Sequence, residues 1–350
     1  MRSLAVWTTT AAVALLGVAS AQTTDATPAA AAPSETDLGA AIAGYAAYQH
    51  DVSELRAAQL RSDSDLEAAL NRVAHHNRGA LTRGWVAYGA STAAQSPAFV
   101  QGVRDAAAYY GRDAVVWAVT VDPSYARSLR GGADATRMLL ESANADSARI
   151  LSVADRYSEL AYSIQRQRWA NAVAPQQAAR VQRVRQLGRD GQGPTTLPSS
   201  MTPRLTVAPL TLSPGTDPTA FGGRRFWDAV GGAPQVTEVS APAVTYQWRV
   251  NASRGEALDR MAALAALQAL DAVNTNQSAV SRLISDPRSE QCFEMAQLQL
   301  YQCMSAARFR YENAFCLGQH GLRDIGVCIG AVAQPDSTAL APAAGSGGRD

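Results

Sequence analysis

The stretch from Cys292 to Cys328 reads CFEMAQLQLYQCMSAARFRYENAFCLGQHGLRDIGVC and holds all four cysteines of the chain. Four cysteines allow three disulfide connectivities. Cys292 and Cys303 are eleven residues apart, which in a helix places them on nearly one face but about 16 Å apart along the axis. Bridged Cα atoms must lie within about 7 Å of each other, so these two cysteines do not bond each other in a helical segment. The same argument disfavours a bond between Cys316 and Cys328.

Nested pairing is the connectivity that we expect, with Cys303 bonded to Cys316 and Cys292 bonded to Cys328. Both pairs are centred near Phe309–Arg310, as an antiparallel helical hairpin requires. The four cysteines are then structural staples. A zinc site is disfavoured because the thiolates are spaced more widely than the short ligand pairs of zinc sites.

Two features leave the other connectivities open. Residues 305–313 contain no Gly or Pro that would mark a turn. Cys316 and Cys328 would also lie about 120° apart on an ideal helix. A turn at Gly318–Gly321 would instead allow Cys303 to bond Cys328.

The N-terminus has the pattern of a signal peptide. Residues 1–21 read MRSLAVWTTTAAVALLGVASA, with Arg2, an apolar run from Leu4 to Val18 and a small-x-small site that predicts cleavage near Ala21. No later segment is apolar enough to predict a transmembrane helix. The even number of cysteines fits an oxidising compartment. We therefore expect a periplasmic or secreted protein.

The composition excludes several kinds of chemistry. The 350 residues carry a formal net charge of +1 and contain no lysine. The near-neutral balance gives no global case for nucleic-acid binding. Without an ammonium group, Schiff-base catalysis, Ser-x-x-Lys acylating sites and lysine-containing phosphate-binding loops are excluded.

The fold class that we predict is mainly α: a multi-helix bundle, a Pro/Thr-rich strap and a C-terminal helical unit stapled by disulfides. Alanine is frequent and favours helix, and apolar residues recur at helical spacing over much of the chain. The predicted segments are a flexible leader (22–34), an N-terminal helical bundle (35–190), the strap with a short β-hairpin (191–252), the C-terminal unit with four cysteines (253–333) and a disordered tail (334–350).

Three local patterns add detail to this plan. Ser64 and Glu67 match a capping box that opens a helix. Residues 114–121, AVVWAVTV, would suit a strand or a buried helix, and their helical neighbours favour the helix. Residues 236–250 are the only β-rich stretch, and Pro242 within them argues for a sheet edge.

No catalytic or metal-binding residue is predicted. His75-His76 is the most suggestive histidine pair, but adjacent residues of a regular helix point about 100° apart and so would not face one metal ion. We expect this pair to end a helix, where a protonated imidazole interacts favourably with the helix dipole. No cofactor is predicted either.

Two surface features are candidates for binding. A stretch without acidic residues carries six arginines, which would suit contact with an anionic surface such as lipid headgroups or an acidic envelope polymer. Alternatively, these arginines form a solvated helix face that is paired with acids elsewhere. They are Arg166, Arg168, Arg180, Arg183, Arg185 and Arg189.

The second feature is aromatic. Trp227, Tyr246 and Trp248 near the strap could bind a sugar or peptide, although such residues more often fasten a strap to the core.

The function that we expect is that of an exported, non-enzymatic scaffold or interaction protein, whose partner is another envelope protein or polymer. One alternative is an exported hydrolase of cell-wall or polysaccharide substrates, and another is an anionic-surface binder. A concave pocket with two carboxylates or a His–acid pair would favour the hydrolase, whereas an exposed apolar patch would favour the scaffold.

Overall fold

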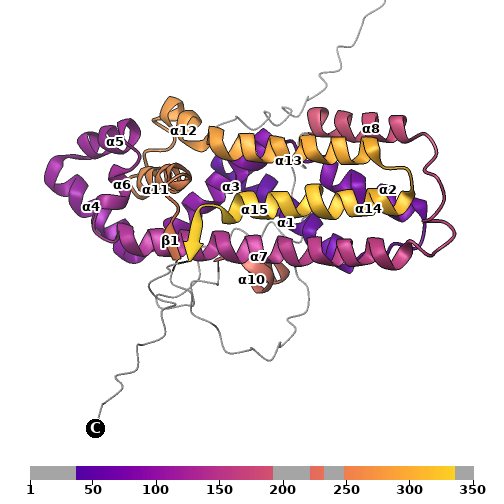
Figure 1. Cartoon of the computed structure of the whole chain (residues 1–350). Coiled ribbons are helices and arrows are strands. Elements are labelled where there is room, and N and C mark those ends of the chain that lie inside the picture. The colour runs from indigo at the N-terminus through magenta and orange to yellow at the C-terminus, as the bar shows by residue number, and fades with distance from the viewer. Residues whose placement is uncertain (1–36, 192–220, 232–247, 336–350) are drawn as a thin grey trace, which may run out of the picture. The chain divides into compact units, whose positions relative to one another are not determined.

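The computed structural model describes residues 37–191, 221–231 and 248–335 (Figure 1). The predicted signal peptide, the leader, most of the strap and the tail from residue 336 lie outside the described residues. All described residues belong to one compact unit of the chain.

The described chain is mainly helical, as the sequence predicts. In chain order, its helices are α1 (Leu38–Ala57), α2 (Asp63–Ala74), α3 (Arg78–Ala93), α4 (Pro97–Tyr110), α5 (Arg112–Val121), α6 (Tyr125–Ser128), α7 (Gly132–Ile164), α8 (Gln177–Asp190), α10 (Gly223–Gly231), α11 (Gly255–Ala269), α12 (Gln277–Ile284), α13 (Pro287–Ala306), α14 (Arg310–Cys316), the π-helix η2 (Leu317–Arg323) and α15 (Asp324–Gly330).

Helices from both halves of the sequence share one core. The long helix α7 lies along α15, η2 and α14, while α3 contacts α1, α11 and α13 (Figure 1). Helices α1 and α3 approach closely at Gly84, where a Cβ atom would lie 2.7 Å from the carbonyl oxygen of Ala41. A larger residue at Gly84 would therefore push the two helices apart.

The C-terminal hairpin forms as the nested pairing predicts. Cys292 bonds Cys328 with their Cα atoms 5.8 Å apart, and Cys303 bonds Cys316 with their Cα atoms 5.6 Å apart. The chain turns between Ala306, the last residue of α13, and Arg310, the first of α14. No Gly or Pro is needed at this turn.

A π-helical segment explains how Cys316 and Cys328 both face α13. The chain runs from α14 through η2 into α15 without a turn at Gly318–Gly321. A π-helix, with its i→i+5 bonds, turns only about 80° per residue instead of about 100°. Over the seven residues of η2, this removes roughly the 120° that would separate the two cysteines on an ideal α-helix.

The described strands do not form the local β-hairpin that the sequence predicts. Strand β1 (Trp248–Val250) pairs antiparallel with β2 (Ala333–Pro335), with Arg249 opposite Gln334. Residues 334 and 335, which the sequence analysis assigns to the tail, are thus paired to the end of the strap. Residues 236–247 lie outside the described residues.

The start of α2 also differs from the prediction. Ser62, not Ser64, caps the helix, and its hydroxyl accepts a hydrogen bond from the Asp65 amide at 3.3 Å. The Glu67 side chain is therefore not part of a capping box, and it pairs with arginines of α8 instead.

Candidate functional site

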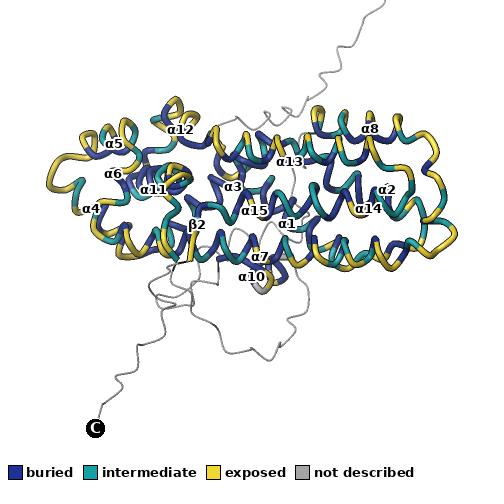
Figure 2. Tube along the Cα trace, viewed as in Figure 1, coloured by how far each residue is buried: buried dark blue, intermediate teal, exposed yellow. Residues whose placement is uncertain are grey.

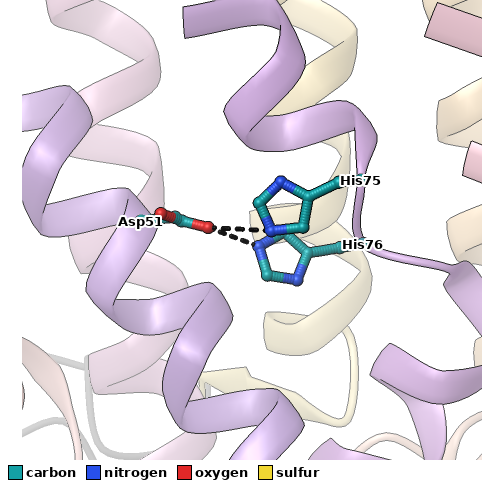
Figure 3. Close-up of side chains that lie close together, drawn as sticks. All are labelled: Asp51, His75 and His76. Atoms are coloured by element: carbon teal, nitrogen blue, oxygen red, sulfur yellow. Dashed lines mark hydrogen bonds and ion pairs between the residues drawn. The ribbon is translucent and has the colours of Figure 1, made fainter. Parts of the chain in front are cut away.

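A His–Asp cluster forms where α2 passes into α3. Helix α2 ends at Ala74, and Asn77 caps α3 by accepting a hydrogen bond from the Ala80 amide at 3.0 Å. His75 and His76 lie in the short link between the helices and face Asp51 on α1 (Figure 3).

Both imidazoles converge on one carboxylate oxygen. Asp51 Oδ2 lies 2.7 Å from His76 Nε2 and 3.3 Å from His75 Nε2. The other oxygen, Oδ1, accepts a hydrogen bond from Arg72 Nη1 at 2.9 Å. Asp51 and His76 are buried, whereas the side chain of His75 is partly exposed.

The protonation of His75 is constrained by its second nitrogen. His75 Nδ1 lies 3.1 Å from the Asn71 carbonyl oxygen, and because a carbonyl oxygen only accepts, Nδ1 carries a proton. In a neutral imidazole, Nε2 then presents a lone pair to Asp51. A cation between His75 Nε2 and Asp51 Oδ2 would accept electron density from both lone pairs.

Burial and hydrogen bonding act in opposite directions on this cluster. Burial raises the pKa of Asp51, but hydrogen bonds from His75 and His76 outweigh it and hold that pKa well below its ordinary value. Burial lowers the pKa of His76 to about 4, against the opposing hydrogen bond to Asp51. At neutral pH, His76 is therefore a neutral imidazole beside an ionised carboxylate.

His75 and His76 face one carboxylate oxygen, although adjacent residues of a regular helix would point about 100° apart. His75 is the C-terminal cap of α2 and His76 lies in a bend after it. Once the backbone leaves the helix, the 100° offset no longer separates the two side chains. The ligand atoms of Asp51, His75 and His76 lie within 4.8 Å of one another.

The arginine stretch does not form one free basic surface. Arg180 is buried and pairs with Asp63, whose Oδ1 is 2.9 Å from its Nη2, and with Glu67. Arg183 also pairs with Glu67. Arg180 and Arg183 are thus paired with acids of α2, and the side chain of Arg183 is exposed beside its ion pair.

The other four arginines differ from these two. The Arg185 guanidinium lies over the ring of Tyr301, 5.3 Å from its centroid. Arg166, Arg168 and Arg189 are exposed, and none of the three has an ion pair within the part of the chain that the structure describes. Arg166 and Arg168 lie beyond the end of α7, not on a common helix with Arg180.

The predicted aromatic patch is not assembled among the described residues. Trp227 is buried, and its indole Nε1 donates to Asp146 Oδ1 at 2.7 Å. It therefore fastens α10 to α7 and has no exposed face for a ligand. Trp248 is partly buried in β1, and Tyr246 lies outside the described residues.

Asp146 on α7 accepts the hydrogen bonds that fasten α10 to α7. Its carboxylate also accepts hydrogen bonds from Tyr45 Oη at 2.8 Å and from the Gly223 amide at 2.6 Å. Burial raises the pKa of Asp146 to about 6, against the lowering effect of these hydrogen bonds. The three donors join α7 to α1 and α10, so we assign Asp146 a structural role.

Four large apolar or aromatic side chains are exposed on α4 and α5, a region that Figure 2 shows to be largely exposed. We use the name hairpin patch for Tyr109, Tyr110, Trp117 and Val121. Trp117 is 66% exposed, and the rings of Tyr109 and Tyr110 contact each other with their centroids 4.6 Å apart.

The exposed residues of α5 were not predicted, because residues 114–121 were expected to form a buried helix. They form the helix α5 as expected, but only Val115, Val116 and Val119 are buried. Ala114, Trp117 and Val121 are exposed. The three- and four-residue spacing of this second stripe is the signal that could have identified it.

A polar cavity of about 540 Å³ lies between the start of α1 and the segment after α11. The residues that line it include Asp37, Asp271 and Gln268. Asp37 caps α1, since its Oδ1 accepts a hydrogen bond from the Gly39 amide at 2.9 Å. Asp271 has a left-handed backbone, with a φ of 51°, which is uncommon outside glycine.

No protein-family model, curated protein or solved structure matches this chain. Within the described ranges, no helix combines the length and the apolar character that crossing a membrane requires. The two disulfides are compatible with an extracellular or periplasmic protein.

Proposed function

We propose that this protein is an exported, non-enzymatic interaction protein and that the hairpin patch docks another protein of the cell envelope. Residues 1–21 would direct its export, and the two disulfides would keep the C-terminal hairpin rigid. The observation that carries the proposal is the exposure of the hairpin patch.

The composition of the hairpin patch suits protein recognition. Tyrosine and tryptophan are enriched among the residues that dominate binding energy at protein interfaces. The patch also has a rigid base, because Val115, Val116 and Val119 on the opposite side of α5 are packed into the core. A partner would therefore gain apolar contacts without having to order the helix.

The charges around the patch favour a protein partner over a lipid surface. Helices that lie in a membrane interface carry Lys and Arg on their polar face. On α5, Asp113 precedes Trp117 and has a side chain that is 99% exposed, while the exposed Asp122 follows Val121. Together with the exposed Arg112, these acids form the mixed polar rim that is typical of protein interfaces.

Site-specific crosslinking tests the proposal. A photoactivatable residue at Ala114, which shares the exposed stripe with Trp117, should crosslink to one envelope protein in exporting cells. The same residue at the exposed Ser163 on α7 is the control. The affinity of the purified partner is then measured for the wild type, W117A and Y162A.

The matched controls make the outcome decisive. Tyr162 is 65% exposed, nearly the same as Trp117, so Y162A removes a comparable aromatic ring elsewhere. Loss of a dominant tryptophan costs about 2 kcal/mol or more, so W117A should weaken binding about 30-fold or more while Y162A leaves it unchanged. Equal effects of the two substitutions would overturn the proposal, as would self-association or vesicle binding that depends on Trp117.

A second candidate function is hydrolysis of a cell-wall or polysaccharide substrate. The polar cavity favours it, because Asp37 and Asp271 line one space and glycoside hydrolysis uses two carboxylates. The wild type would then release reducing ends from purified cell-wall polymer, and D271N would not. Equal release by both proteins, or none by either, would exclude this function for the cavity.

A third candidate is contact with an anionic surface through Arg166, Arg168 and Arg189, the three arginines of the stretch that are exposed and have no ion pair within the described residues. Binding to anionic vesicles should fall with added salt and fall further in R166Q/R168Q. R282Q/R288Q removes two exposed arginines elsewhere and is the matched control. The same vesicle binding by both variants would exclude this function.

A further inference from the structure

We infer that Asp51, His75 and His76 form a binding site for Zn²⁺ or a similar divalent cation that prefers imidazole ligands. The inference rests on the convergence of two Nε2 atoms and one carboxylate oxygen within 4.8 Å (Figure 3). It is independent of the docking function proposed for the hairpin patch.

The distances fit zinc after a small adjustment. Zn–N and Zn–O bonds of about 2.0–2.2 Å in a tetrahedral site place neighbouring ligand atoms about 3.3 Å apart. His75 Nε2 and Asp51 Oδ2 are already 3.3 Å apart. His76 Nε2 and Asp51 Oδ2 are 2.7 Å apart and would separate by about 0.6 Å, as expected when a cation replaces a direct hydrogen bond.

The surroundings of the ligands match those of metal sites. Histidine ligands typically donate their other ring N–H to a carbonyl or carboxylate group, which fixes the tautomer. His75 does so through Nδ1 to the Asn71 carbonyl. Arg72 holds the second oxygen of Asp51, so Oδ2 is left to face the imidazoles. A bound cation would also remove the repulsion between Asp51 Oδ2 and the lone pair of a neutral His75.

The charges of the cluster select the kind of cation. Asp51 is the only carboxylate of the cluster, and Arg72 is bonded to it. Ca²⁺ and Mg²⁺ prefer several oxygen ligands, so this site disfavours them. Two neutral imidazoles and one carboxylate suit Zn²⁺, with water in the fourth position.

Zinc titration of the full chain, purified without a histidine tag, tests the inference by isothermal calorimetry. The wild type should bind one Zn²⁺ per chain. H75Q should weaken binding at least tenfold, because it removes one of three ligands. H75Q is preferred to a His76 variant because the His75 side chain is 30% exposed, whereas the His76 side chain is buried. Unchanged circular dichroism and melting temperature in EDTA would show that the variant is folded.

A matched control separates this cluster from other histidines. His320 also pairs with a carboxylate, since its Nδ1 lies 2.8 Å from Asp324 Oδ2. H320Q should therefore bind Zn²⁺ as the wild type does, and X-ray absorption of the zinc complex should show two imidazole ligands. The inference is overturned if the wild type binds no zinc, if H75Q binds it as tightly as the wild type, or if the spectrum lacks imidazole ligands.

Discussion

Replacing Asp146 with alanine should detach helix α10 from the rest of the helical bundle. The carboxylate accepts hydrogen bonds from Tyr45 Oη, the Gly223 amide and Trp227 Nε1, and all three donors are buried. In D146A these donors lose their acceptor. At about 1.5 kcal/mol for each unsatisfied buried donor, the free energy of unfolding should fall by about 4–5 kcal/mol.

Asparagine at the same position is the matched control. The Gly223 amide and Trp227 both donate to Oδ1, which an asparagine oxygen can replace. Tyr45 Oη can then accept a hydrogen bond from the new amide nitrogen. D146N should therefore cost only about 1 kcal/mol, as expected for one weakened hydrogen bond.

The two variants are compared by urea denaturation at pH 5, with tryptophan fluorescence as the probe because Trp227 contacts Asp146. A large loss for D146A and a small loss for D146N support the argument. A D146A protein within 1 kcal/mol of the wild type would refute the role of the carboxylate as an essential acceptor. Equal losses for both variants would refute the hydrogen-bond assignment.

Comparing the wild type with D146N also tests how stability depends on pH. Burial raises the pKa of Asp146 to about 6 from its ordinary 3.8, so the folded state binds the proton more tightly than the unfolded state does. The contribution of Asp146 to the free energy of unfolding is therefore complete below pH 4. It declines as the pH rises through 6, by about 3 kcal/mol in total. The stability of the wild type relative to D146N should fall over this range, and a rise would contradict the assignment.

Two further predictions concern the staples and the arginines. The disulfide loops span 36 residues for Cys292–Cys328 and 13 residues for Cys303–Cys316. Replacing both cysteines with serine should lower the free energy of unfolding by about 4 kcal/mol for the longer loop and by about 3 kcal/mol for the shorter one. The opposite ranking in denaturant titrations would contradict the loop-length argument. R180Q breaks a buried ion pair with Asp63 and Glu67 and should lower the free energy of unfolding by about 2–3 kcal/mol. R189Q, on the exposed face, should keep the free energy of unfolding within about 0.5 kcal/mol of the wild type. Equal melting temperatures for the two variants would show that the ion pair contributes nothing.

Several features of the fold could be predicted because they depend on local spacing. Helical periodicity and the high alanine content indicated a mainly α protein, and the described residues confirm it. The symmetry of the cysteine positions about Phe309–Arg310 indicated the nested disulfides, which the structure confirms. Each of these inferences uses distances along one or two helices, which fixed helix geometry converts directly into positions in space.

Other features required the tertiary structure, because they depend on which distant segments meet. The π-helical turn at η2 resolves the angular conflict between Cys316 and Cys328, and no sequence signal indicated it. The pairing of Arg180 with Asp63 joins residues 117 positions apart. Likewise, β1 pairs with β2, which lies at the far end of the described chain.

The candidate sites show the same division. The sequence alone determined which residue types were present: two adjacent histidines, an arginine-rich stretch, a tryptophan within residues 114–121 and no lysine. Only the packing of α1 against the end of α2 decided that His75 and His76 meet Asp51. Only the core decided that Trp227 is buried while Trp117 is exposed. Burial and convergence are properties of the packed chain, and periodicity along a single helix does not specify them.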